Sequence, residues 1–273
     1  MADRCLLYYI TDRSQFRCDE CARRRDLLGK IAEAARAGVD YIQLREKDLS
    51  TRELEMLARE VVAIVRENSS LTRLLINSRT DVALAAGADG VHLRADDVGP
   101  REVRQVLEAG DPQRLKPAFF SAAGGTLRLR SGQAFEVVPF PKPARMESVS
   151  ATGESCALPE TMEASAHRPL TTDHFLVAAS CHSNEDVIRA DSEGADFAVF
   201  APVFGKNNAP GRQPTGLAAL HEACRAKIPV LALGGVTMGN AASCLDAGAA
   251  GVAGIRLFQE NKIEDVVRAL RAL

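Results

Sequence analysis

The 273-residue sequence lacks tryptophan, contains only 5% aromatic residues and carries almost no net charge. Its 34 basic and 36 acidic residues give a formal net charge of −2. There is therefore no basic field to favour nucleic acid or an anionic membrane. No apolar run approaches the ~20 residues of a membrane span, and the first residues, MADRCLLYYITD, lack the apolar segment of a signal peptide. We expect a cytoplasmic protein with no nucleic-acid or membrane partner.

Cysteine is present, but not in a pattern that builds disulfides or a zinc finger. The seven cysteines are odd in number and scattered along the chain, which argues against a disulfide framework. Cys18 and Cys21 form one C-x-x-C motif, but no second pair follows at the spacing of a structural zinc site. We interpret these two residues as incidental thiols near the start of the first helix.

A glycine-rich dinucleotide fingerprint is also missing, because the first apolar segment runs into ITDRSQF. This absence weighs against an open doubly wound sheet. Instead, short and nearly continuous apolar segments recur, as is typical of parallel strands covered on both faces. The eight segments are 6–11, 41–46, 74–77, 90–93, 174–180, 197–204, 229–235 and 251–258.

Amphipathic stretches with helical periodicity lie between most of these segments. They span 26–38, 51–68, 99–110, 184–194, 215–226, 239–248 and 263–273, with the shorter TDVALAAGA between the third and fourth strands. Several end in a glycine that can cap a helix in the left-handed conformation, as in Ala-Gly-Ala-Asp (86–89). A strand–helix unit repeated eight times predicts one domain over 1–273, an α/β (β/α)8 TIM barrel.

One region interrupts this repeat. Between the fourth helix and the fifth strand, the segment 111–173 is rich in Gly, Ser, Pro and Thr and has little periodicity. A loop of this length is abnormal inside a compact domain, so we predict a disordered insert. Without it about 210 residues remain, a normal length for a TIM barrel. Helix-to-strand loops lie on the face opposite a barrel's active site, where an insert need not disturb catalysis.

The ends of the predicted strands carry polar, cationic and glycine residues. In a TIM barrel the carboxyl ends of the strands build the active site. The candidate site residues are Gln43, Arg45, Lys47, Asn77, His92, Asp97, Ser180, His182, Lys206, Gly234, Gly235 and Gly254. Such a set suits an anionic, phosphorylated small molecule.

Most of these residues also allow a structural interpretation. The glycines can bring the backbone close to a phosphate or merely permit a tight turn. Arg45 and Lys47 repel each other unless an anion bridges them, or unless carboxylates such as Glu46 and Asp48 pair with them. His92 is either a ligand contact or a packed barrel residue, whereas we expect His182 to act as a general acid or base.

The chain resembles the thiamine phosphate synthase superfamily, which includes the TenI-type thiazole tautomerases. The resemblance rests on LYYITD (7–12), IQLREKD (42–48), LLINSRTDVALAAGADGVHL (74–93), SCHS (180–183), GADFAVFAPVF (194–204), PVLALGG (229–235) and GAAGVAG (248–254). Together these segments cover the chain outside the insert. The resemblance supports the barrel and implies a thiamine-biosynthesis enzyme.

The resemblance also implies roles for the site residues. In a synthase, Gln43, Arg45, Lys47 and Asn77 would contact a pyrimidine methyl diphosphate, and Asp97 would be one of two carboxylates that hold Mg²⁺. The glycine turns would hold a thiazole phosphate. Cations that neutralise the departing diphosphate are what such a reaction needs.

The sequence departs from the synthase pattern at several of these positions. Ser78 stands where the second Mg²⁺ carboxylate is expected, and a hydroxyl is a poor Mg²⁺ ligand. Lys206-Asn207-Asn208 replaces a Thr-x-Thr-Lys loop that grips pyrophosphate, and Arg256 replaces a serine. These departures favour a TenI-like tautomerase with His182 as its catalytic residue, which requires no metal cofactor. Two alternatives are a Mg²⁺-dependent synthase and a non-catalytic binder of a phosphorylated ligand. Assembly into a homo-oligomer is left open.

Overall fold

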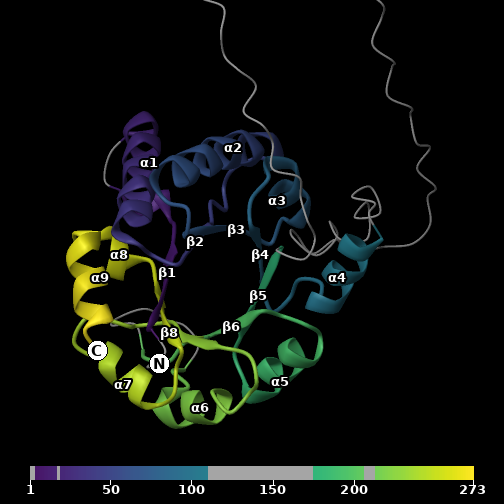
Figure 1. The fold of residues 1–273 in the computed structure, drawn as a ribbon, viewed down its shortest axis with the longest axis vertical. Coiled ribbons are helices and arrows are strands. Elements are labelled where there is room, and N and C mark those ends of the chain that lie inside the picture. Colours follow the sequence, from purple (N-terminus) through teal and green to yellow (C-terminus); the bar gives the residue numbers. More distant parts are fainter. Residues whose placement is uncertain (1–3, 17–18, 110–174, 206–212) are drawn as a thin grey trace, which may run out of the picture. The chain divides into compact units, whose positions relative to one another are not determined.

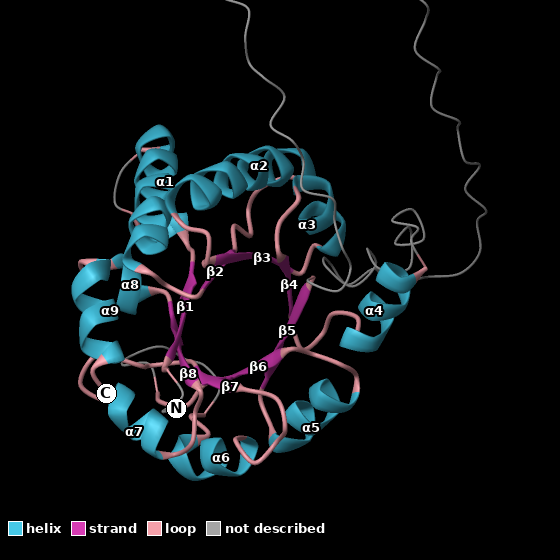
Figure 2. Ribbon diagram, viewed as in Figure 1, coloured by secondary structure: helices cyan, strands magenta, loops and turns pink. Residues whose placement is uncertain are grey.

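Eight parallel strands form a closed barrel with helices outside it (Figures 1 and 2). This computed structural model describes residues 4–16, 19–109, 175–205 and 213–273. Each strand pairs with the next in sequence, and β8 returns to pair with β1. The predicted (β/α)8 TIM barrel is therefore confirmed.

The barrel strands are three to six residues long. They are β1 (Leu6–Ile10), β2 (Tyr41–Leu44), β3 (Arg73–Asn77), β4 (Gly90–Leu93), β5 (Leu176–Cys181), β6 (Phe197–Phe200), β7 (Val230–Ala232) and β8 (Gly251–Gly254). The helices are α1 (Glu20–Ala37), α2 (Thr51–Asn68), α3 (Thr80–Ala86), α4 (Pro100–Glu108), α5 (Asn184–Ser192), α6 (Gly216–Ala223), α7 (Ala241–Asp246), α8 (Arg256–Gln259) and α9 (Ile263–Arg271), with a short 3-10 turn, η1 (Arg13–Gln15).

Local sequence signals define the ends of the helices. The glycines that follow α1 and α3, Gly38 and Gly87, adopt positive φ angles of 83° and 70°. This left-handed conformation satisfies carbonyl groups at a helix C-terminus. At the N-termini of α2 and α5, Ser50 and Ser183 each form a capping box. The chain can therefore turn abruptly between helix and strand.

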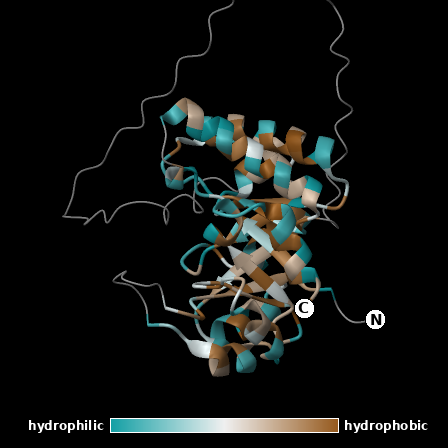
Figure 3. Ribbon diagram, turned by 90° about the vertical axis from the view of Figure 1, so that its left-hand side faces the viewer, coloured by the Kyte–Doolittle hydropathy of each residue, from teal (hydrophilic) through white to brown (hydrophobic). Residues whose placement is uncertain are grey.

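The apolar residues separate into two layers. Inside the barrel, alternate residues such as Tyr8, Leu75 and Phe197 pack together. The intervening residues face outward and pack against the helices, as Cys181 does. Figure 3 shows apolar colouring on the central strands and hydrophilic colouring on much of the helices and loops. Strand alternation thus assigns each residue to the barrel interior or to the outer layer.

The eighth predicted strand is wrong at its C-terminal end. We predicted a strand over 251–258, but β8 ends at Gly254 and residues Arg256–Gln259 form α8. Leu257 and Phe258 are buried in this helix, and a short apolar run suits a buried strand or a buried helix, so periodicity could not distinguish the two conformations. Gln259 fixes this helix to the barrel, because its side-chain oxygen accepts a hydrogen bond from the Asp12 backbone N–H (3.0 Å).

The predicted insert at 111–173 lies between α4 and β5, outside the described residues, and its predicted disorder stays a prediction. Cys18 is also outside them, whereas Cys21 is an exposed free thiol on α1. Among the described helices, none is long and apolar enough to cross a membrane.

Candidate active site

Polar side chains at the carboxyl ends of the strands form two sets, which contain several of the candidate residues. We call the first set the interior row; it consists of Gln43, Tyr8, His92 and Ser180, which point into the barrel from β2, β1, β4 and β5. We call the second set the rim; it consists of Arg45, Lys47, Ser78, Asp97 and His182, which follow β2, β3, β4 and β5.

The interior row is a continuous chain of hydrogen bonds. Gln43 Nε2 donates to the Tyr8 hydroxyl (3.2 Å), which lies 3.1 Å from His92 Nδ1. His92 Nε2 lies 2.7 Å from the Ser180 hydroxyl. Burial, and secondarily the charge of Arg45, lower the pKa of His92 from 6.5 to about 3. His92 is therefore a neutral, packed barrel residue, and the sequence pattern gave no reason to include Tyr8.

Arg45 is half-buried on the rim, beside the end of the interior row. Its backbone N–H donates to the Thr11 hydroxyl (2.9 Å). Within the described part of the chain, however, its guanidinium forms no hydrogen bond or ion pair. Burial lowers the pKa of Arg45, and the more distant charges of Asp12 and Glu46 oppose this effect. A partly desolvated cation without a neutralising contact is well suited to receive an anion.

The carboxylates next to Arg45 are engaged elsewhere. Glu46 accepts hydrogen bonds from Thr11 Oγ1 (2.7 Å) and from Arg13 Nη1 (3.1 Å). Asp48 pairs with the same guanidinium through both of its oxygens, at 2.7 and 3.0 Å. The alternative in which Glu46 or Asp48 pairs with Arg45 is therefore wrong. Arg13 takes both carboxylates, and its burial was not apparent from the sequence.

Ser78 has an unusual backbone for its residue type. Its φ angle is +60°, a conformation that asparagine and aspartate adopt more readily than serine. The Ser78 N–H donates to the His92 carbonyl (2.9 Å), and Asn77 Nδ2 donates to the Ser78 hydroxyl (3.1 Å). The hydroxyl is thus held at the end of β3, next to β4.

The residues at the ends of β3 and β4 do not fit a two-carboxylate Mg²⁺ site. Asp97 Oδ2 accepts a hydrogen bond from the Arg94 backbone N–H (2.7 Å), and Asp96 pairs with the Arg94 guanidinium. Ser78 contributes only a neutral oxygen. Across the described residues, no group of three His, Cys, Asp or Glu side chains could hold a metal ion. Asp97 therefore remains as a single carboxylate, bonded within its own turn.

His182 differs from His92 in both exposure and hydrogen bonding. It is half-buried after β5, and its Nδ1 lies 2.6 Å from the Ala201 carbonyl oxygen. A carbonyl only accepts, so Nδ1 carries the hydrogen and Nε2 has a lone pair in the neutral ring. The His182 backbone N–H donates to Asp186 Oδ2 (3.0 Å), which fixes the start of α5. The ring is thereby oriented with one nitrogen available for proton transfer.

The glycine turns are shaped by close packing. Gly234 and Gly235 have φ angles of +96° and +67°, and a Cβ at Gly234 would lie 2.7 Å from Pro202 Cα. A Cβ at Gly254 would lie 3.0 Å from Leu257 Cβ. The positive φ angles of Gly234 and Gly235 agree with a tight turn, which is the structural interpretation of these two glycines. Their role in phosphate binding remains a prediction.

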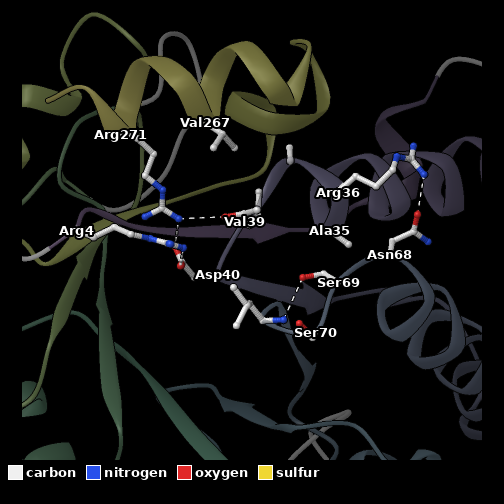
Figure 4. Close-up of a pocket in the computed structure, with 13 residues that line it drawn as sticks. Arg4, Ala35, Arg36, Val39, Asp40, Asn68, Ser69, Ser70, Val267 and Arg271 are labelled. Carbon is white, nitrogen blue, oxygen red and sulfur yellow. Dashed lines mark hydrogen bonds and ion pairs between the residues drawn. The ribbon is translucent and has the colours of Figure 1, made fainter.

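Lys206 lies outside the described residues, and Lys47 is exposed on the rim. A separate pocket of about 460 Å³ lies near the amino ends of the strands (Figure 4). Its arginines are occupied internally: Arg271 and Arg4 pair with Asp40, and Arg36 donates to Asn68. The rim is therefore the better candidate for an anionic ligand.

A sequence profile described as "Thiamine monophosphate synthase" matches residues 7–111 and 158–258. The thiamine-phosphate synthase of Methanoculleus marisnigri is 30% identical over 268 residues, which cover 97% of this chain and 93% of that protein. The chain belongs to the thiamine monophosphate synthase family. The thiamine-phosphate synthase of Solidesulfovibrio magneticus is 45% identical over 109 residues, 40% of this chain and 46% of that protein.

The fold also matches a solved structure, the thiamine phosphate pyrophosphorylase from Pyrococcus furiosus. The TM-score is 0.63 at 22% identity, covering 99% of this chain and 95% of that one. The predicted thiamine-biosynthesis family is confirmed. The preference for a tautomerase over a synthase is not supported, because the relatives are named as synthases. That preference gave too much weight to Ser78 and to the loop that begins at Lys206.

Proposed function

We propose that this protein is a thiamine-phosphate synthase, a transferase that joins a pyrimidine methyl diphosphate to a thiazole phosphate and releases pyrophosphate. The observation that carries the proposal is the half-buried Arg45 guanidinium, for which no described residue provides an ion pair. The protein's membership of the family adds weight to the proposal, since the relatives are named thiamine-phosphate synthase. A diphosphate leaving group would neutralise Arg45 and be stabilised by it.

Other candidate residues receive roles by resemblance to the family. Lys47 and Asn77 follow Arg45 around the barrel mouth, and Gln43 lies below them in the interior row. We assign these residues to the pyrimidine diphosphate. The turn at Gly234-Gly235 is assigned to the thiazole phosphate, because a backbone without Cβ atoms can approach phosphate oxygens closely.

The family's use of Mg²⁺ requires a separate proposal for this chain. The described residues offer Asp97, a carboxylate in the loop after β4, and Ser78, a weak neutral donor at the end of β3. Mg²⁺ commonly binds through one or two carboxylates together with substrate phosphates and water. We therefore expect Mg²⁺ to bind weakly to the protein alone and more tightly in the presence of the diphosphate.

A thiazole tautomerase is the second candidate, favoured by the orientation of His182. The hydrogen bond from Nδ1 to the Ala201 carbonyl leaves Nε2 for a proton shift. Such a reaction requires a held phosphate and one acid or base, and no diphosphate. The synthase reaction makes no such demand on His182, so this residue separates the two candidates.

The test is a pair of assays on the purified wild-type chain. In the first, pyrimidine methyl diphosphate, thiazole phosphate and Mg²⁺ are supplied, and thiamine phosphate is measured. In the second, the carboxythiazole phosphate tautomer is supplied alone, and its isomerisation is followed. We expect thiamine phosphate to form in the first assay.

The variant His182→Gln gives the matched comparison. It should leave thiamine phosphate formation within about tenfold of wild type, because that reaction needs no proton transfer at this position. If the wild type isomerises the thiazole and forms no thiamine phosphate, the synthase proposal is wrong. A His182→Gln variant that then loses isomerisation by about 10²-fold or more would establish the tautomerase. Binding of the phosphates without turnover in either assay would identify a binder.

A further inference from the structure

The interior row has a direction, because each of its groups has a fixed number of hydrogens to donate. The Tyr8 side chain is fully buried, and its ring is held edge-on against Tyr41 and Phe197, with centroids 5.8 and 5.6 Å away. Its hydroxyl therefore cannot turn towards water. Its hydrogen-bond partners in the described structure are Gln43 Nε2 and His92 Nδ1.

The direction follows from Gln43. An amide nitrogen only donates, so the Tyr8 oxygen accepts from Gln43, and the single Tyr8 hydrogen must go to His92 Nδ1. Neutral His92 then carries its hydrogen on Nε2, which donates to the Ser180 hydroxyl oxygen at 2.7 Å. The Ser180 hydrogen is not used in the row. Because Ser180 is half-buried at the end of β5, that hydrogen is available to a ligand at the barrel mouth.

The opposite direction would leave a buried donor without a partner. If His92 Nδ1 donated to Tyr8, the Tyr8 oxygen would accept two hydrogen bonds, and its own hydrogen would have no acceptor. Reversal requires the Gln43 amide to present its oxygen instead of its nitrogen to Tyr8. The neutral state of His92 keeps the row from being charged, since burial lowers its pKa to about 3.

We propose that Tyr8 is a positioning residue: it fixes His92 in the Nε2–H tautomer, so that Ser180 presents a hydrogen-bond donor to the substrate. The ligand group that meets Ser180 is then an acceptor, such as a phosphate oxygen or an unprotonated ring nitrogen. This inference rests on the proposed function for its catalytic consequence, although the tautomer itself is independent of the reaction.

The tautomer is measured directly by long-range ¹H–¹⁵N correlation spectra of the histidine rings in ¹⁵N-labelled full-length protein. The His92 signals are assigned by their loss in His92→Gln. In wild type we expect His92 with hydrogen on Nε2 only. In Tyr8→Phe, His92 should populate the Nδ1–H tautomer, and kcat/KM for thiamine phosphate formation should fall about tenfold.

Two further variants separate positioning from structural damage. Tyr9→Phe is the matched control, because Tyr9 is equally buried and its hydroxyl has no hydrogen-bond partner in the described structure. It should change neither tautomer nor rate. Ser180→Ala should reduce kcat/KM and keep His92 in the Nε2–H tautomer.

A wild-type His92 with hydrogen on Nδ1 would overturn the proposal, as would a Tyr8→Phe variant with unchanged tautomer and rate. If Tyr8→Phe does not fold, the His92 tautomer in wild type and in Ser180→Ala still tests the proposal. Absence of thiamine phosphate from the wild-type reaction would contradict the proposed function and leave the tautomer result standing.

Discussion

The interior row and the rim lie within a few residues of each other along the same strands, yet their polar groups are in opposite situations. In the interior row, Gln43, Tyr8 and His92 are buried and hydrogen-bonded to one another. On the rim, Arg45 is only half-buried and forms no ion pair with any described residue. The buried groups complete the fold, whereas the incompletely neutralised group is the one that we propose receives the ligand.

The two histidines show the same contrast. His182 Nδ1 lies against a carbonyl, which requires a hydrogen on that nitrogen, whereas His92 Nδ1 lies against a hydroxyl that can donate to it. If Tyr8 donates to His92 as we propose, the two rings carry their hydrogens on different nitrogens in their neutral forms. Both histidines were identified as candidates because they lie at the ends of strands, and the sequence alone does not show which of them is buried within the barrel. The difference teaches that location at a strand end is not sufficient for contact with substrate. The hydrogen-bond partners of a side chain determine whether it has a group left to bind a ligand.

The largest expected effect comes from removing the rim cation. Arg45→Gln should reduce kcat/KM for thiamine phosphate formation by about 10²- to 10³-fold, because it removes a charged donor to the leaving diphosphate. The melting temperature should be unchanged or higher, since a partly desolvated charge is lost. Arg59→Gln, which removes an exposed cation paired with Glu55 on α2, is the control and should retain full activity. Full activity in Arg45→Gln would remove the distinction between the rim and the interior row.

The next effect concerns the interior row and acid stability. The folded chain holds His92 neutral, with its pKa lowered to about 3, whereas the unfolded chain binds a proton near the ordinary value of 6.5. The contribution of His92 to stability is therefore present above pH 6.5 and is lost as the pH falls towards 3. Its slope approaches roughly 1.4 kcal/mol per pH unit in the free energy of unfolding.

This dependence is measured by urea unfolding between pH 4.5 and 6.5. The variant His92→Gln should show a shallower decline than wild type, since its side chain does not titrate. His221→Gln, which changes an exposed histidine, should decline as wild type does. Parallel curves for wild type and His92→Gln would show that His92 is not held neutral by the fold.

The smallest expected effect is an increase in Mg²⁺ affinity when a carboxylate is added to the rim. Ser78→Asp should raise the apparent affinity for Mg²⁺ in the synthase reaction about tenfold, equal to roughly 1.4 kcal/mol, because a carboxylate replaces a hydroxyl at the end of β3, next to β4. Aspartate also tolerates the +60° φ angle at this position. Ser70→Asp, at an exposed site before β3, is the control for added negative charge. An unchanged Mg²⁺ dependence in Ser78→Asp would place the metal elsewhere.

Much of the fold could be predicted from the sequence because apolar period and glycine caps are local signals. The segment GVHL was assigned to its residues as β4, and 51–68 as α2. The predictions were wrong where an apolar run suits two conformations, as at Leu257 and Phe258 in α8. Burial between the barrel and the helices is compatible with either a strand or a helix, and only tertiary contacts determine which of them forms.

The sequence predicted where the candidate site residues lie, but it did not predict which residues they hydrogen-bond with. Arg45 and His182 were identified from their places at strand ends. The role of Arg13 was missed, because two of its three carboxylate partners, Glu46 and Asp48, lie more than thirty residues away in sequence. Tyr8 was missed because a tyrosine within an apolar strand has the pattern of a core residue. Such long-range hydrogen bonds leave no periodic signal in a single sequence.

The most direct test of the central claim is the binding of inorganic pyrophosphate by titration calorimetry, without thiazole phosphate. If the rim receives the diphosphate, wild type should bind it, and Arg45→Gln should bind at least tenfold more weakly. Arg59→Gln, which removes an exposed cation on α2, should bind within about twofold of wild type. Equal affinities for wild type and Arg45→Gln would contradict the account.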